Sequence, residues 1–155
     1  IFPLLSKHFA QIAMAKVSAS ALEATDMGYL KSEVVIIANP NELLYVAKQQ
    51  AIAMLESGFR SPLDDTFKVV GKAGYANIMA QVANLFEGSF MSQHDKYCIS
   101  SLAKVMTGSL VEENTVVNSK MLLDLEQKYF VELLGTQKTQ DRIEFMLRNS
   151  KPLRN

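Results

Sequence analysis

One short run of this sequence combines three side-chain types that carry chemistry. Ser92-Gln93-His94-Asp95 places a hydroxyl, an imidazole and a carboxylate within four residues. Such a set could transfer a proton or hold a ligand, because imidazole titrates near neutral pH. The spacing of Ser92 and Asp95 is also that of a helix cap, and the adjacent His94 and Asp95 would not face each other on a helix. We expect a structural cap and assign no catalytic residue, with a ligand or proton-transfer role for His94 as the alternative.

A glycine pair in Gly71-Lys72-Ala73-Gly74 is the second candidate, because it follows a plausible short strand that begins at Phe67. Glycine-rich turns between a strand and a helix bind dinucleotides, since their backbone amides approach the pyrophosphate closely. This pattern lacks the full spacing and the acidic residue about 20 positions later. We therefore expect a turn that starts a helix, and we assign no cofactor-binding residue to it.

Positive charge gathers in the last eighteen residues, at Lys138, Arg142, Arg148, Lys151 and Arg154. Solvated surface is the plain interpretation of such a cluster. Phosphate binding by Arg142 and Lys151 is the alternative.

Composition excludes several classes of function. Sixteen basic and sixteen acidic residues cancel, so the charge does not indicate binding to nucleic acid or to a membrane surface. No apolar run approaches the roughly 20 residues that span a bilayer, and no signal-like segment opens the chain. Two histidines and one cysteine, Cys98, give no metal-ligand spacing. We therefore expect no metal site. A single cysteine forms no internal disulfide and favours a reducing compartment, so we expect a cytoplasmic location.

Helical periodicity dominates the chain. Start and stop signals predict helices that include residues 5–13, run from Ser20 to Gly28, from near Pro40 to about Ser57, through residues 75–86 to Gly88, from Ser92 to Gly108, from Asn118 or Ser119 to Gly135, and onward from about Thr139. Residues 34–37 and 67–71 are expected to be extended, residues 109–117 to form the main loop with a mobile tip, and the tail after Pro152 to be non-helical. The sequence therefore predicts a mainly α fold of six to seven amphipathic helices with one or two short extended segments.

Two helices carry the clearest signals. Ser20 and Glu23 predict a capping box in which Glu23 reaches back to the amide of Ser20, and Gly28 ends that helix. Gly58 lies just past the next helix, and Pro62 should block its continuation. We also expect one apolar face at residues 44, 47, 51 and 55, and methionines that fill gaps in the core at Met79, Met106, Met121 and Met146.

The helix pair at residues 20–57, with its flanks from residue 14, resembles the last part of the enoyl-CoA hydratase (crotonase) fold. Further along, residues 92–95, 122–126, 138–143 and 151–155, which read SQHD, LLDLE, KTQDRI and KPLRN, are similar to the tail of one enzyme group. These are the long bacterial 3-hydroxyacyl-CoA dehydrogenases with a hydratase-like region. The resemblance spans nearly the whole chain. It implies a single helical domain at 1–155, in which residues 1–62 end the crotonase-like region and residues 63–155 form a helical C-terminal extension.

For function, the resemblance implies a parent enzyme of fatty-acid β-oxidation. The parent would oxidise a 3-hydroxyacyl-CoA to the 3-oxoacyl-CoA with NAD, and enoyl-CoA hydration stays open as a further activity. The family's catalytic carboxylates, enolate-binding amides, histidine and glutamate lie upstream, and nothing in this chain matches them. We therefore expect an inactive segment without its own cofactor, in which Arg142 and Lys151 are candidates for a coenzyme A phosphate.

The start Ile1-Phe2-Pro3 reads like the interior of a protein. We expect a fragment, although a removed tag or methionine is the alternative. Its partners would be the upstream dehydrogenase and hydratase-like regions, with acyl-CoA as the parent's substrate. Apolar surface that the upstream sheet normally covers should be bare, which favours a homo-oligomer. A free-standing helical protein-interaction module is the alternative function.

Overall fold

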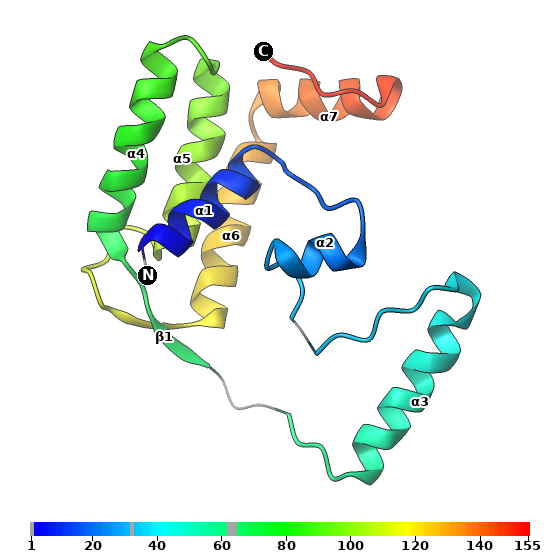
Figure 1. Cartoon of the computed structure of the whole chain (residues 1–155). Coiled ribbons are helices and arrows are strands. Elements are labelled where there is room, and N and C mark those ends of the chain that lie inside the picture. Colours follow the sequence, from blue (N-terminus) through cyan, green and yellow to red (C-terminus); the bar gives the residue numbers. More distant parts are fainter. Residues whose placement is uncertain (1, 32, 62–64) are drawn as a thin grey trace. The chain divides into compact units, whose positions relative to one another are not determined.

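The computed structural model describes residues 2–31, 33–61 and 65–155 (Figure 1). The predictions for Ile1 and Pro62 lie outside these residues. Within them the chain forms seven α-helices, one 3-10 helix and two short strands, which confirms the predicted mainly α class. The chain divides into two compact units, one of residues 1–14 and 64–155 and one of residues 15–63. The single domain with a boundary between residues 62 and 63 stays a prediction.

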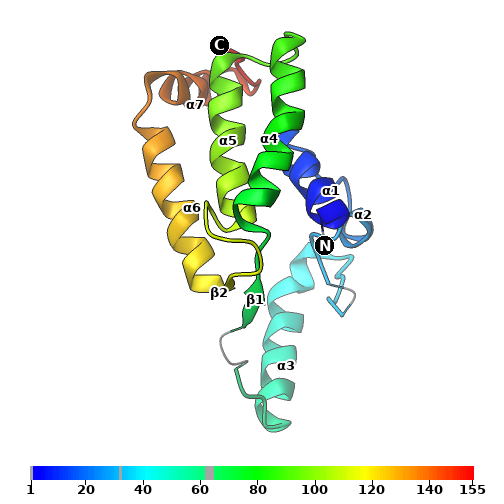
Figure 2. The same ribbon diagram turned by 90° about the vertical axis from the view of Figure 1, so that its left-hand side faces the viewer.

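Three helices build the core of the larger unit: α1 (Phe2–Ala13), α4 (Gly71–Glu87) and α5 (Gln93–Thr107). Phe9, Ile78, Val82 and Ala103 are buried together between them. Figures 1 and 2 show α4 and α5 side by side, joined by a short turn. The helices form where the apolar periodicity predicts them, because one stripe of each can be buried against the other two.

Of the two segments predicted to be extended, one contains a strand and the other does not. Strand β1 (Thr66–Lys68) pairs in antiparallel register with β2 (Val116–Asn118), and Phe67 lies opposite Val117. Residues 34–37 form no strand, and β2 lies at the end of the segment predicted as a loop. A strand of three residues is defined by its partner rather than by its own periodicity, which is why the local pattern missed β2.

Helices α6 (Ser119–Leu134) and α7 (Gln137–Asn149) complete this unit. Asn118, one of the two predicted starts, caps α6 through its side-chain oxygen, which accepts from the amide of Met121 at 2.9 Å. Thr136 caps α7, so this helix begins two residues before the predicted Thr139. In Figure 2, α6 lies along α5 and α7 follows it. The tail after Pro152 is non-helical, as predicted.

The smaller unit contains α2 (Ala21–Asp26), the 3-10 turn η1 (Pro40–Glu42) and α3 (Leu43–Glu56). Ser20 caps α2 as predicted, since its Oγ accepts from the amide of Glu23 at 3.1 Å. The Glu23 carboxylate accepts from the amide of Ala19, at 2.7 Å, and not from the predicted Ser20. Gly28, with φ +82°, ends the segment in the left-handed conformation that glycine adopts without a steric penalty.

Residues of the predicted apolar face of α3 are exposed. Leu44 is 83% exposed and Leu55 78% exposed, and no residue of α3 is buried. Among the methionines, Met79 and Met106 pack against the core as predicted. The prediction that Met146 fills a gap in the core is wrong, because Met146 is 45% exposed on α7.

Candidate functional site

The chemistry-bearing residues of the sequence meet where the start of α5 contacts α7 and the tail. Ser92 and Asp95 form a capping box: Ser92 Oγ accepts from the amide of Asp95 at 3.1 Å, and Asp95 Oδ2 accepts from the amide of Ser92 at 3.0 Å. This arrangement satisfies backbone groups that the first turn of a helix leaves unpaired. The predicted structural cap is confirmed.

Arg142 of α7 joins this cap to the tail. Its Nη1 donates to Asp95 Oδ1 at 2.8 Å, and its Nε donates to Asn155 Oδ1 at 2.8 Å. Its Nη2 donates to the backbone oxygen of Asn155 at 3.3 Å and to Ser92 Oγ at 3.4 Å. We call Ser92, Asp95, Arg142 and Asn155 the Arg142 cluster. All three guanidinium nitrogens are used, so the cluster fixes α5, α7 and the tail to one another.

The carboxyl of Asp95 is held in its charged form. Burial by itself would raise its pKa, but hydrogen bonds from the Ser92 amide and the Arg142 guanidinium outweigh burial and lower the pKa below its ordinary value. Asp95 is therefore a counter-ion near neutral pH and a poor proton donor.

His94 lies beside the cluster and is buried. Its Nε2 lies 2.9 Å from Thr139 Oγ1 on α7, and Thr139 in turn bonds the Thr136 hydroxyl at 2.8 Å. Burial, followed by the nearby charges of Arg142 and Lys138, lowers the pKa of His94, while Asp95 opposes them. The imidazole is neutral at pH 7 and links α5 to α7, in keeping with the structural role that the sequence favours.

The two phosphate candidates differ in availability. Arg142 would have to leave Asp95 and Asn155 to hold a phosphate, which costs charge-assisted hydrogen bonds. Lys151 is exposed in the tail and could meet a phosphate without rearrangement. Binding of a coenzyme A phosphate by either residue stays a prediction.

The glycine pair lies at the start of α4, and the predicted helix-start turn is confirmed. Gly71 has φ +54°, and a Cβ at this position would lie 2.2 Å from the backbone oxygen of Val111. The amide of Lys72 donates to that same oxygen at 2.8 Å, and its ammonium pairs with Glu112. The glycine thus allows close contact between the start of α4 and the segment before β2.

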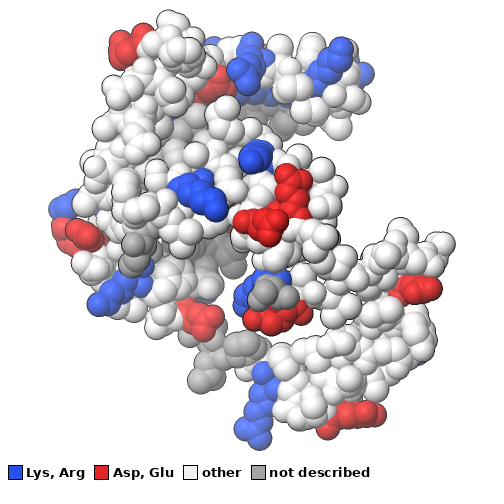
Figure 3. Space-filling view, viewed as in Figure 1, with Lys and Arg blue, Asp and Glu red and all other residues white. Residues whose placement is uncertain are grey.

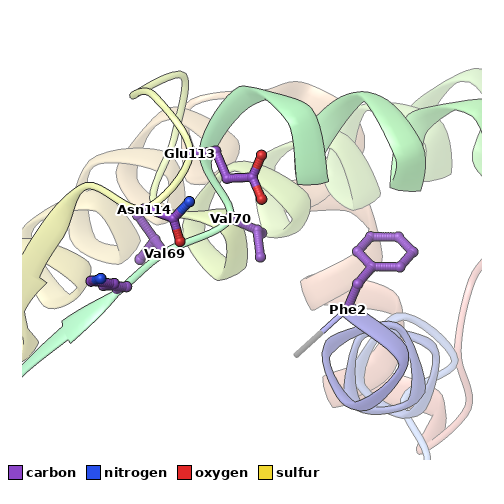
Figure 4. A pocket seen from close by; sticks show the side chains of 6 residues that line it. Phe2, Val69, Val70, Glu113 and Asn114 are labelled. Carbon is purple, nitrogen blue, oxygen red and sulfur yellow. The ribbon is translucent and has the colours of Figure 1, made fainter.

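A cavity of about 260 Å³ opens beside this contact (Figure 4). Figure 4 shows Phe2 of α1 across the space from Val70 and Glu113. The remaining lining residues are Lys68, Val69 and Asn114. No sequence pattern predicts this cavity, because its lining residues flank two strands that are distant in the sequence and pair only in the fold. The positive charge of Lys68 and the negative charge of Glu113 cancel, so the cavity has no net charge that would select an anion.

Other chemistry is sparse in the part of the chain that the structure describes. No group of three or more His, Cys, Asp or Glu side chains there could hold a metal ion. Burial raises the pKa of the Cys98 thiol, which keeps it protonated and weakly nucleophilic. Figure 3 shows acidic and basic side chains in small groups distributed over one face. None of the described helices is long and apolar enough to cross a membrane.

Comparison with known proteins gives an informative match. Over 149 residues the chain is 41% identical to a probable 3-hydroxyacyl-CoA dehydrogenase of Bacillus subtilis (strain 168). The match covers 96% of this chain and 19% of that protein, so the chain spans about a fifth of the relative's length. No protein-family model and no solved structure matches the chain.

Proposed function

We propose that this chain is a packing and assembly segment of a longer 3-hydroxyacyl-CoA dehydrogenase and forms its C-terminal part. The observation that carries the proposal is the 41% identity over 96% of the chain to a protein of that description. The longer cytoplasmic enzyme would oxidise a 3-hydroxyacyl-CoA to the 3-oxoacyl-CoA with NAD in fatty-acid β-oxidation. A hydratase-like region of crotonase type would precede this segment.

The described surface supports a segment that packs against other protein. Large apolar side chains with more than three quarters of their surface exposed include Val17, Leu44, Leu55 and Leu147. Exposed apolar side chains in such numbers favour a protein partner. The alternative, a free-standing interaction module, would be favoured by a polar outer surface.

The Arg142 cluster supports a structural role in place of a catalytic one. Its charged and polar groups bond one another rather than an open space. A catalytic acid or base needs access to substrate, which the neutral, buried His94 lacks. NAD and the reacting carbon would be bound by residues of the longer protein.

Three measurements test this proposal. An antibody against the chain should detect, in native cell extract, one band several times larger than 17.2 kDa, and a band at 17.2 kDa would contradict the proposal.

The purified longer protein should reduce NAD with 3-hydroxyacyl-CoA, while the 155-residue chain should not. In the longer protein, His94→Ala should keep its turnover once corrected for folded protein. Loss of turnover with an unchanged melting temperature would assign His94 a catalytic role.

A further inference from the structure

Helix α7 is docked on α5 through polar side chains, and no residue of α7 is itself buried. The described bonds between α7 and α5 with its cap are those of Arg142 to Asp95 and Ser92, and that of Thr139 to His94. Elements with few buried apolar side chains are the ones that open locally while the rest of a protein stays folded. The docking of α7 therefore depends on a small polar interface.

The tail is bonded to α7. Asn155 accepts from two nitrogens of Arg142, at 2.8 and 3.3 Å. Its own Nδ2 donates to the backbone oxygen of Lys138 at 3.3 Å. Because both partners lie on α7, the tail would move together with this helix. We call α7 and the tail at residues 150–155 the α7 arm.

His94 is a titratable group at the interface between α5 and the α7 arm, and only 6% of it is exposed. Its Nε2 contacts the hydroxyl of Thr139, and a hydroxyl can donate a hydrogen bond as well as accept one. This bond can therefore form with a neutral or with a charged imidazole. The ring of Tyr97 lies tilted beside it, with 6.2 Å between the ring centres. The choice between the two charge states is left to burial and to the neighbouring charges.

The charged groups that act on His94 come from both helices. Arg142 and Lys138 of α7 are cations, and Asp95 of α5 is an anion. Burial, followed by the two cations, lowers the pKa of His94, and Asp95 opposes them only in part. The Asp95 oxygens already accept from the Ser92 amide and from Arg142. A proton on His94 would repel the α7 arm in particular, because both cations belong to it.

We propose that His94 is a proton-sensitive latch: protonation of its imidazole releases the α7 arm from α5, while the core of α1, α4 and α5 stays folded. An imidazole that α7 no longer covers regains water and loses its two cationic neighbours, so it binds a proton more readily than the docked one. The contribution of His94 to docking is therefore complete above its ordinary pKa of 6.5 and is lost as the pH falls through the lower pKa of the docked state. The latch consists of residues of this chain and does not depend on the reaction of the longer enzyme.

Hydrogen exchange with mass spectrometry, on the natural polypeptide that contains this chain, tests the latch. Between pH 7.5 and pH 5.5 the protection factors of α7, corrected for the intrinsic effect of pH, should fall several-fold, with a limit of about tenfold per pH unit for one proton. Those of α4 should stay constant. In His94→Gln, which can still reach Thr139 but does not titrate, α7 should keep its protection, whereas the control His8→Gln should show the full fall. An equal fall in α4 and α7, or in His94→Gln and the unaltered protein, would overturn the proposal.

Lys138 keeps the test valid if His94→Gln already loses protection of α7 at pH 7.5. Its side chain is exposed, and Asn155 bonds only its backbone oxygen. Lys138→Gln should therefore leave the arm docked at pH 7.5 and make the fall in protection towards pH 5.5 smaller, because one of the two repelling cations is gone. Lys128→Gln on α6, also exposed, is the matched control and should show the full fall. The same pH response in both lysine variants would overturn the proposal.

Discussion

Arg142 and Asp95, 47 residues apart in the sequence, form an ion pair that joins α7 to α5, with Nη1 of the arginine 2.8 Å from Oδ1 of the aspartate. Only 21% and 23% of the two side chains is exposed. The aspartate is already the third residue of a capping box, so one carboxylate both starts α5 and holds α7. The stability of the C-terminal part of the larger unit should therefore depend on this pair.

Replacing Arg142 tests that dependence. Arg142→Ala should lower the free energy of unfolding by about 2 kcal/mol, because it leaves a partly buried carboxylate without its partner. Arg148→Ala on the same helix is the control: its pair with Glu144 is 75% and 60% exposed and should contribute less than about 0.5 kcal/mol. Urea unfolding measures both values. Equal losses in the two variants would mean that the buried pair adds nothing specific.

Acid should reveal the role of Asp95. Its pKa in the folded protein is below the ordinary 3.8, so the unfolded chain binds a proton more readily. The stabilisation from Asp95 is complete above that value and is lost as the pH falls through the lower, folded-state pKa. Asp95→Asn should reduce stability at pH 7 and make the loss below the ordinary pKa of 3.8 shallower than in the unaltered protein. A parallel pH profile for the two proteins would contradict the lowered pKa.

His94 should act in a different pH window. Its pKa is below the ordinary 6.5, so the unfolded chain takes up a proton first as the pH falls. The protein should lose stability below about pH 6.5, and His94→Gln, which can still reach Thr139 but does not titrate, should lose less. Melting temperatures at pH 7.5 and 5.5 measure the difference. His8→Gln is the control, because that histidine bonds only its neighbour Gln11 among the contacts described, at 2.9 Å.

The part of this fold that sequence could predict is the part set by local contacts. Ser92 with Asp95, and Gly28, define helix ends through bonds or backbone angles within a few residues, so their patterns were sufficient. Strand β2 was missed because Val117 is ordered by its partner Phe67, distant in the sequence. The ion pair between Arg142 and Asp95 was missed for the same reason, although its two members were both singled out for their chemistry.

Gly71 gives the sharpest test of the contact between α4 and the segment before β2. Gly71→Ala should destabilise the protein by more than about 2 kcal/mol, because alanine disfavours its φ of +54° and its Cβ would meet the backbone oxygen of Val111 at 2.2 Å. Backbone atoms cannot move aside as a flexible side chain can. Gly135→Ala is the matched control, since Gly135 has φ −70° and its nearest neighbour would lie 3.4 Å away. That variant should stay within about 0.5 kcal/mol of the unaltered protein in urea unfolding. A mild effect in Gly71→Ala would mean that the segment before β2 does not lie against α4 in solution, and the cavity beside Phe2 would then lose one of its walls.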